Sequence, residues 1–242
     1  MNDPWTRLRQ ATTARIGLGR CGDGLPTAAL LDFQLAHARA RDAVHTPFDP
    51  AALAATLDGF AVVTVRSQAG SRAAYLQRPD LGRRLDPACA AALVSGEYDA
   101  AFVIGDGLSA TGVHAHAVPT LKAVLARLAG WRIAPVVLAE QARVALGDEI
   151  GARLGAAMVA VLIGERPGLS AADSLGIYLT WAPRPGRSDA ERNCISNIHP
   201  PDGLGYDIAA DRLAWLMREA RSRKLTGVGL KDLSPPPALP GA

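Results

Sequence analysis

Charged residues follow an apolar run in the second half of the chain. The run from Met158 to Ile163 has the length and composition of a buried parallel strand, and Glu165 and Arg166 come directly after it. In open α/β sheets, ligands gather just outside the carboxyl ends of the strands. A carboxylate at that place can accept hydrogen bonds from a ligand. Glu165 is therefore a candidate binding residue.

Two other polar clusters have a similar setting. Asp106 and Ser109 follow the apolar run Ala100 to Ile104, and Asn193 to Asn197 is a mostly polar run that no packing requirement explains. In a parallel sheet these clusters could converge with Glu165 on one edge. They predict a pocket for a ligand rich in amides or phosphates. Residue spacing alone leaves a nucleotide and a larger cofactor both open.

A GxGxxG pattern runs from Gly17 to Gly22. Such glycines bind dinucleotides when they join a strand to a helix. Here the preceding segment, Thr12 to Ile16, is a poor strand, and Asp23 to Pro26 interrupts the place where the helix should start. The context favours a Gly-rich turn, and a free-standing nucleotide-binding α/β enzyme stays as an alternative function.

Two further patterns suggest chemistry that their context disfavours. Gly107 to Thr111 approximates the nucleophile elbow of serine hydrolases, but Thr111 stands where the motif requires its second glycine. His114 and His116 could share one face of a strand, yet no third ligand has the spacing of a zinc site. Neither serine hydrolysis nor zinc chemistry is therefore expected.

Composition and charge narrow the class of protein. Of the 242 residues, 49% are hydrophobic and 20% are charged, which is typical of globular proteins. The net charge of +3 is small and argues against a nucleic-acid-binding surface. Five arginines lie between Arg66 and Arg84. They could receive an anion or an acidic partner surface, or pair with carboxylates such as Asp80 and Asp86 in a solvated loop.

No segment predicts secretion or a membrane span. The first ten residues lack the apolar core of a secretory signal. The longest apolar run, around Gly155 to Gly164, is about half of the roughly 18 residues that a span needs. The 3 cysteines are scattered without CxxC spacing, which fits a reducing cytoplasm better than disulfides. We expect a soluble intracellular protein with no membrane or nucleic-acid partner.

The elements that must position these residues alternate along the chain. Strands expected at 60–65, 100–104, 133–138 and 158–163 alternate with helices at 88–95, 119–128 and 142–154, and a further strand at 175–181 follows. This order predicts an α/β fold with a mostly parallel, doubly wound, Rossmann-like sheet. A long helix at 206–224 closes it, with one apolar side formed by Ala209, Leu213, Leu216 and Met217.

Three regions are expected from this organisation. Residues 1–58 form an N-terminal helical region, in which Thr27 caps a helix that runs to Val44 with Leu30, Leu31 and Leu35 at helical spacing. Residues 59–233 form the α/β domain. Residues 234–242, SPPPALPGA, form a disordered Pro-rich tail.

Several long motifs resemble those of one enzyme family. GERPGL, DSLGIYLTW and RNCISNIH occur in this order between residues 164 and 199, and they closely resemble the light chain of adenosylcobalamin-dependent ethanolamine ammonia-lyase. YLQRPDLGRRL, DGLSATGVHAHAV and GVGLKD agree with the same family, in whose light DGLSATGVHAHAV is expected to be a loop at the sheet edge. The resemblance covers the chain from Trp5 to Asp232.

The resemblance implies a function for the chain. In this family the light chain partners a larger chain, a barrel that holds the substrate and supplies the residues that act on it, and adenosylcobalamin lies between the two. Homolysis of the cobalt–carbon bond starts a radical conversion of ethanolamine to acetaldehyde and ammonia. The resemblance thus predicts the small subunit of a hetero-oligomeric lyase, with no catalytic residue of its own. A regulatory or scaffolding subunit without cobalamin contact is the second alternative.

Three cofactor contacts carry over from the family by motif: Val144, Glu165 and Cys194. Glu165 could accept hydrogen bonds from the amide side chains of the corrin, while Val144 and Cys194 offer apolar or weakly polar contact. The alternatives are an ion pair of Glu165 with Arg166, which adjacent side chains on an extended chain disfavour, and a simply buried Cys194. The chain has no DxHxxG run, so the cofactor's own base is expected to stay on cobalt, with no metal ligand from the protein.

Some family members carry a long N-terminal extension linked to packaging in bacterial microcompartments. This chain starts about four residues before Trp5, where its resemblance to the family begins. We therefore expect a cytoplasmic location, with packaging in a microcompartment left as an open alternative.

Overall fold

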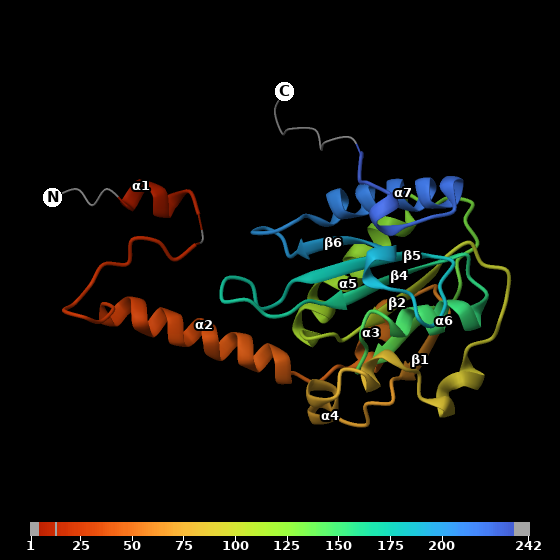
Figure 1. The fold of residues 1–242 in the computed structure, drawn as a ribbon, viewed down its shortest axis with the longest axis horizontal. Coiled ribbons are helices and arrows are strands. Elements are labelled where there is room, and N and C mark those ends of the chain that lie inside the picture. The colour runs from red at the N-terminus through yellow and green to blue at the C-terminus, as the bar shows by residue number, and fades with distance from the viewer. Residues whose placement is uncertain (1–4, 13, 235–242) are drawn as a thin grey trace.

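A computed structural model describes residues 5–12 and 14–234. Its centre is a six-stranded mixed sheet in the order β1-β3-β2-β4-β5-β6, with helices on both faces (Figure 1). Residues 1–4 and 13 of the expected N-terminal region and 235–242 of the expected tail lie outside the described residues. The strands are β1 (Val62–Arg66), β2 (Ala101–Gly105), β3 (Val136–Glu140), β4 (Met158–Gly164), β5 (Leu175–Trp181) and β6 (Arg192–Ile198).

Strands β1, β3, β2 and β4 run parallel to one another, and every residue of β2 and β4 is buried. Strands covered on both faces are continuously apolar, which is why these runs are recognisable in the sequence. Strand β5 is antiparallel to β4, and β6 is antiparallel to β5. The predicted α/β fold with a mostly parallel sheet is confirmed. Strand β6 was not predicted, because only Arg192, Ile195 and Ile198 of its seven residues are buried.

Helices cover the two faces of the sheet with separate apolar cores. On one face α3 (Pro50–Thr56), α5 (Ala110–Leu125) and α7 (Tyr206–Arg223) pack on alternate strand residues such as Phe102 and Leu162. On the other face α6 (Leu146–Leu154) packs on the intervening residues, which include Val103 and Val161. Each large apolar side chain buried in this way stabilises the fold by roughly 1.5–3 kcal/mol. The four apolar residues predicted for one side of the last helix, Ala209, Leu213, Leu216 and Met217, are all buried.

Helix α5 corrects the expected loop at the sheet edge. Residues 110–118 form the first half of this helix, and Pro119 lies inside it rather than at its start. The Ser109 hydroxyl accepts a hydrogen bond from the Gly112 N–H at 3.1 Å. This N-cap satisfies one of the free donors at the start of a helix and so fixes the beginning before the proline.

Other element boundaries also differ from those predicted. Strand β3 starts at Val136 rather than at residue 133, directly after Pro135, which has no N–H to donate to a ladder. The helix expected at 88–95 is a 3₁₀ segment, Pro87–Ala92, and α6 begins at Leu146 rather than at residue 142. The structure also contains elements that were not predicted: the short helix α4 (Arg72–Gln77) and the 3₁₀ segments Leu81–Arg83, Asp189–Glu191 and Gly227–Gly229.

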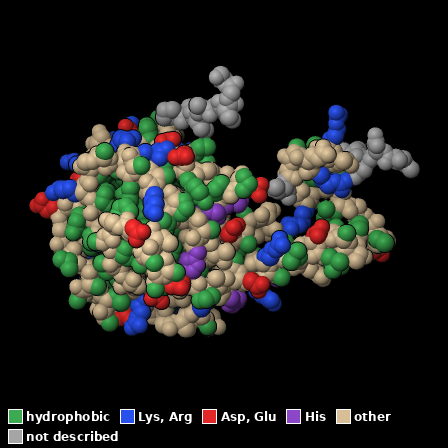
Figure 2. All heavy atoms as spheres, turned by 180° about the vertical axis from the view of Figure 1, so that it is seen from behind, with side chains coloured by type: hydrophobic (Ala, Val, Ile, Leu, Met, Phe, Trp, Pro, Cys, Tyr) green, Lys and Arg blue, Asp and Glu red, His purple; other side chains and the backbone are tan. Residues whose placement is uncertain are grey.

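Helices α1 (Trp5–Gln10) and α2 (Thr27–His45) project from the body as an arm, here called the N-terminal arm (Figures 1 and 2). The N-cap position of α2 is Pro26 with no side-chain cap, so the predicted capping role of Thr27 is wrong. Only Ala36 and Ala43 of α2 are buried. The end of α2 is tied to the body because Arg72 Nε donates to the Val44 carbonyl at 2.7 Å. No helix of the described residues is long and apolar enough to cross a bilayer.

Candidate functional site

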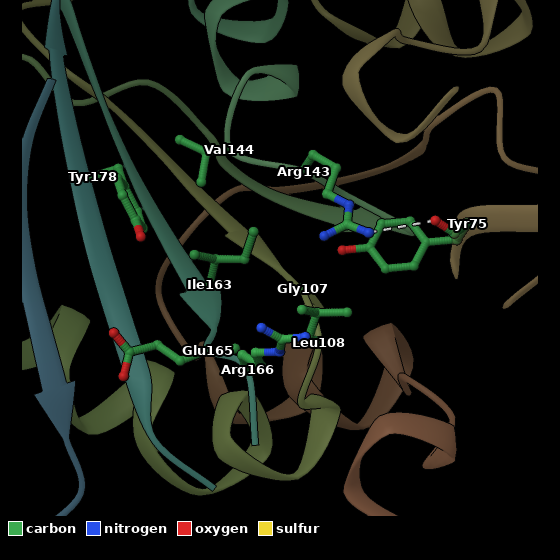
Figure 3. Close-up of a pocket in the computed structure, with 10 residues that line it drawn as sticks. Tyr75, Gly107, Leu108, Arg143, Val144, Ile163, Glu165, Arg166 and Tyr178 are labelled. Carbon is green, nitrogen blue, oxygen red and sulfur yellow. Dashed lines mark hydrogen bonds between the residues drawn. The ribbon is translucent and has the colours of Figure 1, made fainter. Parts of the chain in front are cut away.

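A hollow of about 460 Å³ lies at the carboxyl ends of the parallel strands (Figure 3). The chain leaves β2 toward β3 on one side and later returns past β2 to form β4 on the other. The hollow is therefore at a switch in strand order, where open α/β sheets bind ligands. Its walls come from the loops after β2 and β3, the end of β4, strand β5 and helix α4. The lining residues are Tyr75, Gly107, Leu108, Arg143, Val144, Ile163, Gly164, Glu165, Arg166 and Tyr178.

Glu165 lies where the sequence placed it, just beyond the end of β4, and its side chain is half-buried. One carboxylate oxygen, Oε2, accepts the Asn197 N–H at 3.1 Å. A Cβ at residue 176 would lie 2.9 Å from the other oxygen, so Gly176 leaves the space that this oxygen needs. Oε1 has no hydrogen-bond donor, and Glu165 forms no ion pair with Arg166, among the residues that the structure describes. The carboxylate thus keeps an acceptor for a ligand.

Cys194 lies beside the hollow rather than in its wall. It is exposed and stands directly opposite Tyr178 in the ladder between β5 and β6. Directly paired residues share one face of a sheet, and Tyr178 lines the hollow. Surrounding atoms exclude enough solvent to raise the pKa of the Cys194 thiol, although the Tyr178 hydroxyl opposes this shift. The thiol is therefore neutral near pH 7, and the alternative of a simply buried cysteine is wrong.

Val144 lies in the turn between β3 and α6, half-buried at the wall of the hollow. Neighbouring contacts fix this turn. The Asp106 carboxylate accepts the Ala142 N–H at 2.8 Å, and the Tyr75 hydroxyl donates to the Ala142 carbonyl at 3.0 Å. The Arg143 N–H donates to the Gly82 carbonyl at 2.8 Å. Helix α4 and the end of β2 together hold Val144 in place.

Asp106 and Ser109 support the hollow from behind instead of lining it. Asp106 is 1% exposed and accepts a hydrogen bond from Arg72 Nη1 at 3.1 Å. Burial raises the pKa of Asp106 to about 6, and the Ala142 N–H and the Arg72 guanidinium limit the rise. Ser109 is fully buried, caps α5 and donates to the Ala172 carbonyl at 2.9 Å.

Some polar residues of β6 stabilise the fold, and others lie near the hollow. The buried Arg192 guanidinium makes a bidentate pair with Asp148 on α6, at 2.6 and 2.7 Å. The Asn193 amide donates to the Leu230 carbonyl at 2.7 Å and so anchors the C-terminal segment. Cys194 is paired with Tyr178 of the wall, and the Asn197 N–H donates to Glu165.

The two histidines lie on helix α5, so they do not share the strand face that their spacing would have allowed. His114 Nε2 accepts the Asp49 N–H at 3.1 Å, and the ring stacks on Phe48. His116 is buried and pairs through Nδ1 with the Tyr206 hydroxyl at 2.9 Å. Both rings therefore join elements of the fold. Among the described residues no group of three or more side chains could hold a metal ion.

The arginines between residues 66 and 84 include surface ion pairs and one residue that reaches into the body. Arg66 pairs with Asp86 at 2.7 Å and Arg78 with Asp80 at 2.8 Å, both at the surface. These are the carboxylate pairs of the solvated-loop interpretation, and such exposed pairs contribute little stability. Arg72 instead reaches into the body toward Asp106.

The glycine run near the N-terminus does not form a dinucleotide site. Gly17, Gly19 and Gly22 all adopt positive φ, residues 14–20 form no strand, and α2 begins only at Thr27. The dinucleotide fingerprint requires a strand directly before the glycines and a helix opening on them. The basis of the nucleotide-binding alternative is therefore absent from this part of the fold.

Among the polar side chains in the wall, Tyr75, Arg143 and Tyr178 were not singled out from the sequence. Arg143 follows the carboxyl end of β3, so the rule that singled out Glu165 could have found it on the neighbouring strand. Tyr75 lies on a short helix and Tyr178 within an apolar strand. Neither has a local signal that separates it from a packing residue.

Comparison with known proteins agrees with the motifs around this site. Residues 2–231 match the family model described as ethanolamine ammonia-lyase light chain (EutC). The ethanolamine ammonia-lyase small subunit of Azotobacter vinelandii is 56% identical, with 99% of this chain and 92% of that protein covered. The small subunit from Rhodopseudomonas palustris is 60% identical, with 93% of this chain and 88% of that protein covered. The small subunit from Ralstonia nicotianae is 56% identical, with 98% of this chain and 91% of that protein covered. The chain belongs to the ethanolamine ammonia-lyase light chain family.

Proposed function

We propose that this chain is the small subunit of an adenosylcobalamin-dependent ethanolamine ammonia-lyase, which converts ethanolamine to acetaldehyde and ammonia. In this proposal it contributes one side of the cobalamin site at an interface with the large catalytic subunit. The observation that carries the proposal is the grouping of Val144, Glu165 and Cys194 around one hollow at the carboxyl ends of the strands. These residues come from three separate segments of the chain.

The chemistry of the wall fits a corrinoid. Val144 and Ile163 offer an apolar surface to the macrocycle, and Glu165 Oε1 offers an acceptor to its amide arms. Arg143 lines the hollow without an ion-pair partner among the described residues, so its guanidinium could serve as a donor. Drug-sized ligands already occupy roughly 300–1,000 Å³, so a hollow of about 460 Å³ can hold only part of a corrinoid. The remainder would be covered by the large subunit.

The three site residues of this chain would bind or orient the cofactor. Glu165 would hold amide arms through hydrogen bonds that fix the rotation of the macrocycle. Val144 would pack against it, and the neutral Cys194 thiol would make a weakly polar contact without competing for cobalt. Adenosylcobalamin supplies the cobalt–carbon bond whose homolysis starts the radical reaction. The residues that handle ethanolamine are assigned to the large subunit.

Residues 59–233 would form a Rossmann-like, doubly wound domain that contacts cobalamin, and residues 1–58 an N-terminal helical region. Helices on both faces of the sheet and the switch in strand order at the hollow support this description. The scattered free cysteines support a cytoplasmic location, with packaging in a microcompartment as the alternative.

The test is an acetaldehyde-release assay with adenosylcobalamin and ethanolamine. This chain, the large subunit from the same organism and their mixture are assayed separately. We expect activity only in the mixture, because each chain supplies one side of the cofactor site. A mixture that forms a complex by size-exclusion chromatography and yet releases no acetaldehyde would contradict the proposal.

A further inference from the structure

Arg143 presents a cation to the hollow without a counter-ion of its own. Its guanidinium lies 4.3 Å from the centre of the Tyr75 ring (Figure 3). Nη2 reaches the Tyr75 carbonyl at 3.5 Å, the outer limit of a hydrogen bond. Nε is buried with no partner, and no carboxylate forms an ion pair with Arg143 among the described residues.

Two other largely buried arginines each have a carboxylate as an ion-pair partner. Arg192 is held by both oxygens of Asp148, and Arg72 by Asp106 and the Gly107 carbonyl. A cation withdrawn from water without a counter-ion carries a free-energy penalty. Arg143 therefore differs in being oriented by the protein while its charge stays uncompensated. An anion that enters the hollow would remove this penalty.

The chain is built to hold Arg143 in this position. A Cβ at residue 82 would lie 2.9 Å from Arg143 Cγ and 3.0 Å from the Tyr75 ring, so Gly82 leaves room for both side chains. The Gly82 carbonyl also accepts the Arg143 N–H at 2.8 Å. Arg166 lines the same hollow, is exposed and forms no ion pair among the described residues. Two guanidinium groups without an ion-pair partner among the described residues thus line one cavity, together with the Glu165 carboxylate.

We propose that Arg143, assisted by Arg166, forms an anion subsite for the phosphodiester in the nucleotide loop of cobalamin. This inference rests on the proposed function. The phosphodiester is the anionic group among the otherwise neutral amide arms of the cofactor, and the planar fork of arginine matches phosphate oxygens. The subunit that holds ethanolamine would need access to the cobalt–carbon bond. This would leave the side of the corrin that carries the nucleotide loop to this chain.

The test compares two corrinoids that differ in the nucleotide loop. Adenosylcobalamin contains the phosphodiester, whereas adenosylcobinamide has the same corrin and adenosyl group without the nucleotide loop. Equilibrium dissociation constants are measured by absorbance titration for the complex of this chain with its large subunit. The variants are Arg143→Gln, Arg143→Lys, Arg166→Gln and the control Arg153→Gln, which changes an arginine of α6 that pairs with Glu149 outside the hollow.

We expect Arg143→Gln to weaken binding of adenosylcobalamin about 10- to 100-fold, as for loss of a hydrogen bond to a charged group, and to leave adenosylcobinamide within about twofold. Arg143→Lys should recover part of the loss, Arg166→Gln should lose less, and Arg153→Gln should match the wild type. A small loss that is equal for both corrinoids would overturn the subsite. So would tight binding of ATP that Arg143→Gln abolishes while cobalamin affinity is unchanged.

The two proposals fail in different ways. A wild-type complex that binds neither corrinoid would overturn the proposed function and the subsite with it. A wild-type complex that binds cobalamin and retains the same preference over cobinamide in Arg143→Gln would overturn the subsite alone. Because Arg143→Lys keeps the charge and most of the stem, it separates loss of the anion contact from loss of folding.

Discussion

The Glu165 carboxylate accepts a hydrogen bond from the fold through only one of its two oxygens, among the described residues. One oxygen is occupied by the Asn197 N–H, which fixes the side chain across the ends of β4, β5 and β6. The glycine at position 176 leaves room for the other. The carboxylate is half-buried and its second oxygen has no donor among the described residues, so it remains a strong acceptor with a defined direction. An amide donor on a ligand requires such an acceptor.

The first prediction at the residue scale concerns Glu165→Gln. The amide keeps the shape but places a donor where a ligand amide would also present a donor. We expect the complex with the large subunit to bind adenosylcobalamin about 10-fold more weakly or worse, because hydrogen bonds to charged groups contribute roughly 1.5–3 kcal/mol. Absorbance titration measures this change. Glu219→Gln, which alters a surface pair with Arg223 on α7, is the matched control.

Unchanged affinity in Glu165→Gln would favour the alternative of a scaffolding subunit without cobalamin contact. A loss shared by Glu219→Gln would point instead to a general weakening of the complex. The two variants therefore separate a ligand contact from an effect on assembly.

At the scale of elements, Asp106 is the junction on which the wall of the hollow depends. Its carboxylate joins the end of β2 to the turn after β3 through Ala142 and to α4 through Arg72. The same turn carries Arg143 and Val144 into the hollow. A buried carboxyl group in such a junction makes stability depend on pH, because its pKa differs between the folded and unfolded chain.

Asp106 has a pKa of about 6 in the folded protein against 3.8 as its ordinary value. Between these values the folded protein holds a proton that the unfolded chain has lost. The free energy of unfolding should therefore decrease as pH rises from about 4 to 6, by up to about 1.4 kcal/mol per pH unit from this group. Asp106→Asn removes the contribution, so the advantage of the wild type over the variant should shrink over that range.

Urea denaturation of both proteins at a series of pH values measures this difference. Asp80→Asn is the control, because hydrogen bonding to Arg78 lowers the pKa of that exposed carboxyl group and its titration lies below the window. An advantage of the wild type that grows between pH 4 and 6 would show that Arg72 dominates over burial at Asp106.

At the scale of the whole molecule, the N-terminal arm exposes apolar side chains that a compact body would cover. Leu31 is 57% exposed and Leu35 is 50% exposed, and Leu30 and Phe33 on the same helix are also exposed. Figure 2 shows the arm projecting from the main body. Apolar exposure gathered on one projecting helix is typical of a surface that another chain covers. The large subunit of the proposed complex would be that chain.

The prediction for the arm is that Leu31→Glu weakens association with the large subunit. Burial of a leucine side chain in the interface would stabilise the complex by roughly 1.5–3 kcal/mol, so its loss should raise the dissociation constant about 10- to 100-fold. Light scattering with size-exclusion chromatography at several concentrations measures it. Val94→Glu changes a residue of the body that is 71% exposed and serves as the control. An intact complex in Leu31→Glu would assign the arm no part in this interface.

The α/β class and the carboxyl-end position of Glu165 follow from local residue patterns. Runs such as Met158–Ile163 are recognisable because a strand covered on both faces must be apolar throughout. The polar residues that follow them are then expected at one edge of the sheet. The motifs around Glu165 and Cys194 identified the family, which the comparisons confirm. All of this information is local in the chain.

Contacts between distant segments determine which polar residues line the hollow and which support its wall. Asp106 contacts Ala142, 36 residues away, and the Arg143 side chain is oriented by Tyr75, 68 residues away. Asp106 and Glu165 follow their strands in the same way, and yet one is buried beneath the turn and the other borders the hollow. Whether a charged group is paired depends on partners that folding brings together. Residue spacing cannot encode that outcome, because the partners are distant in the chain.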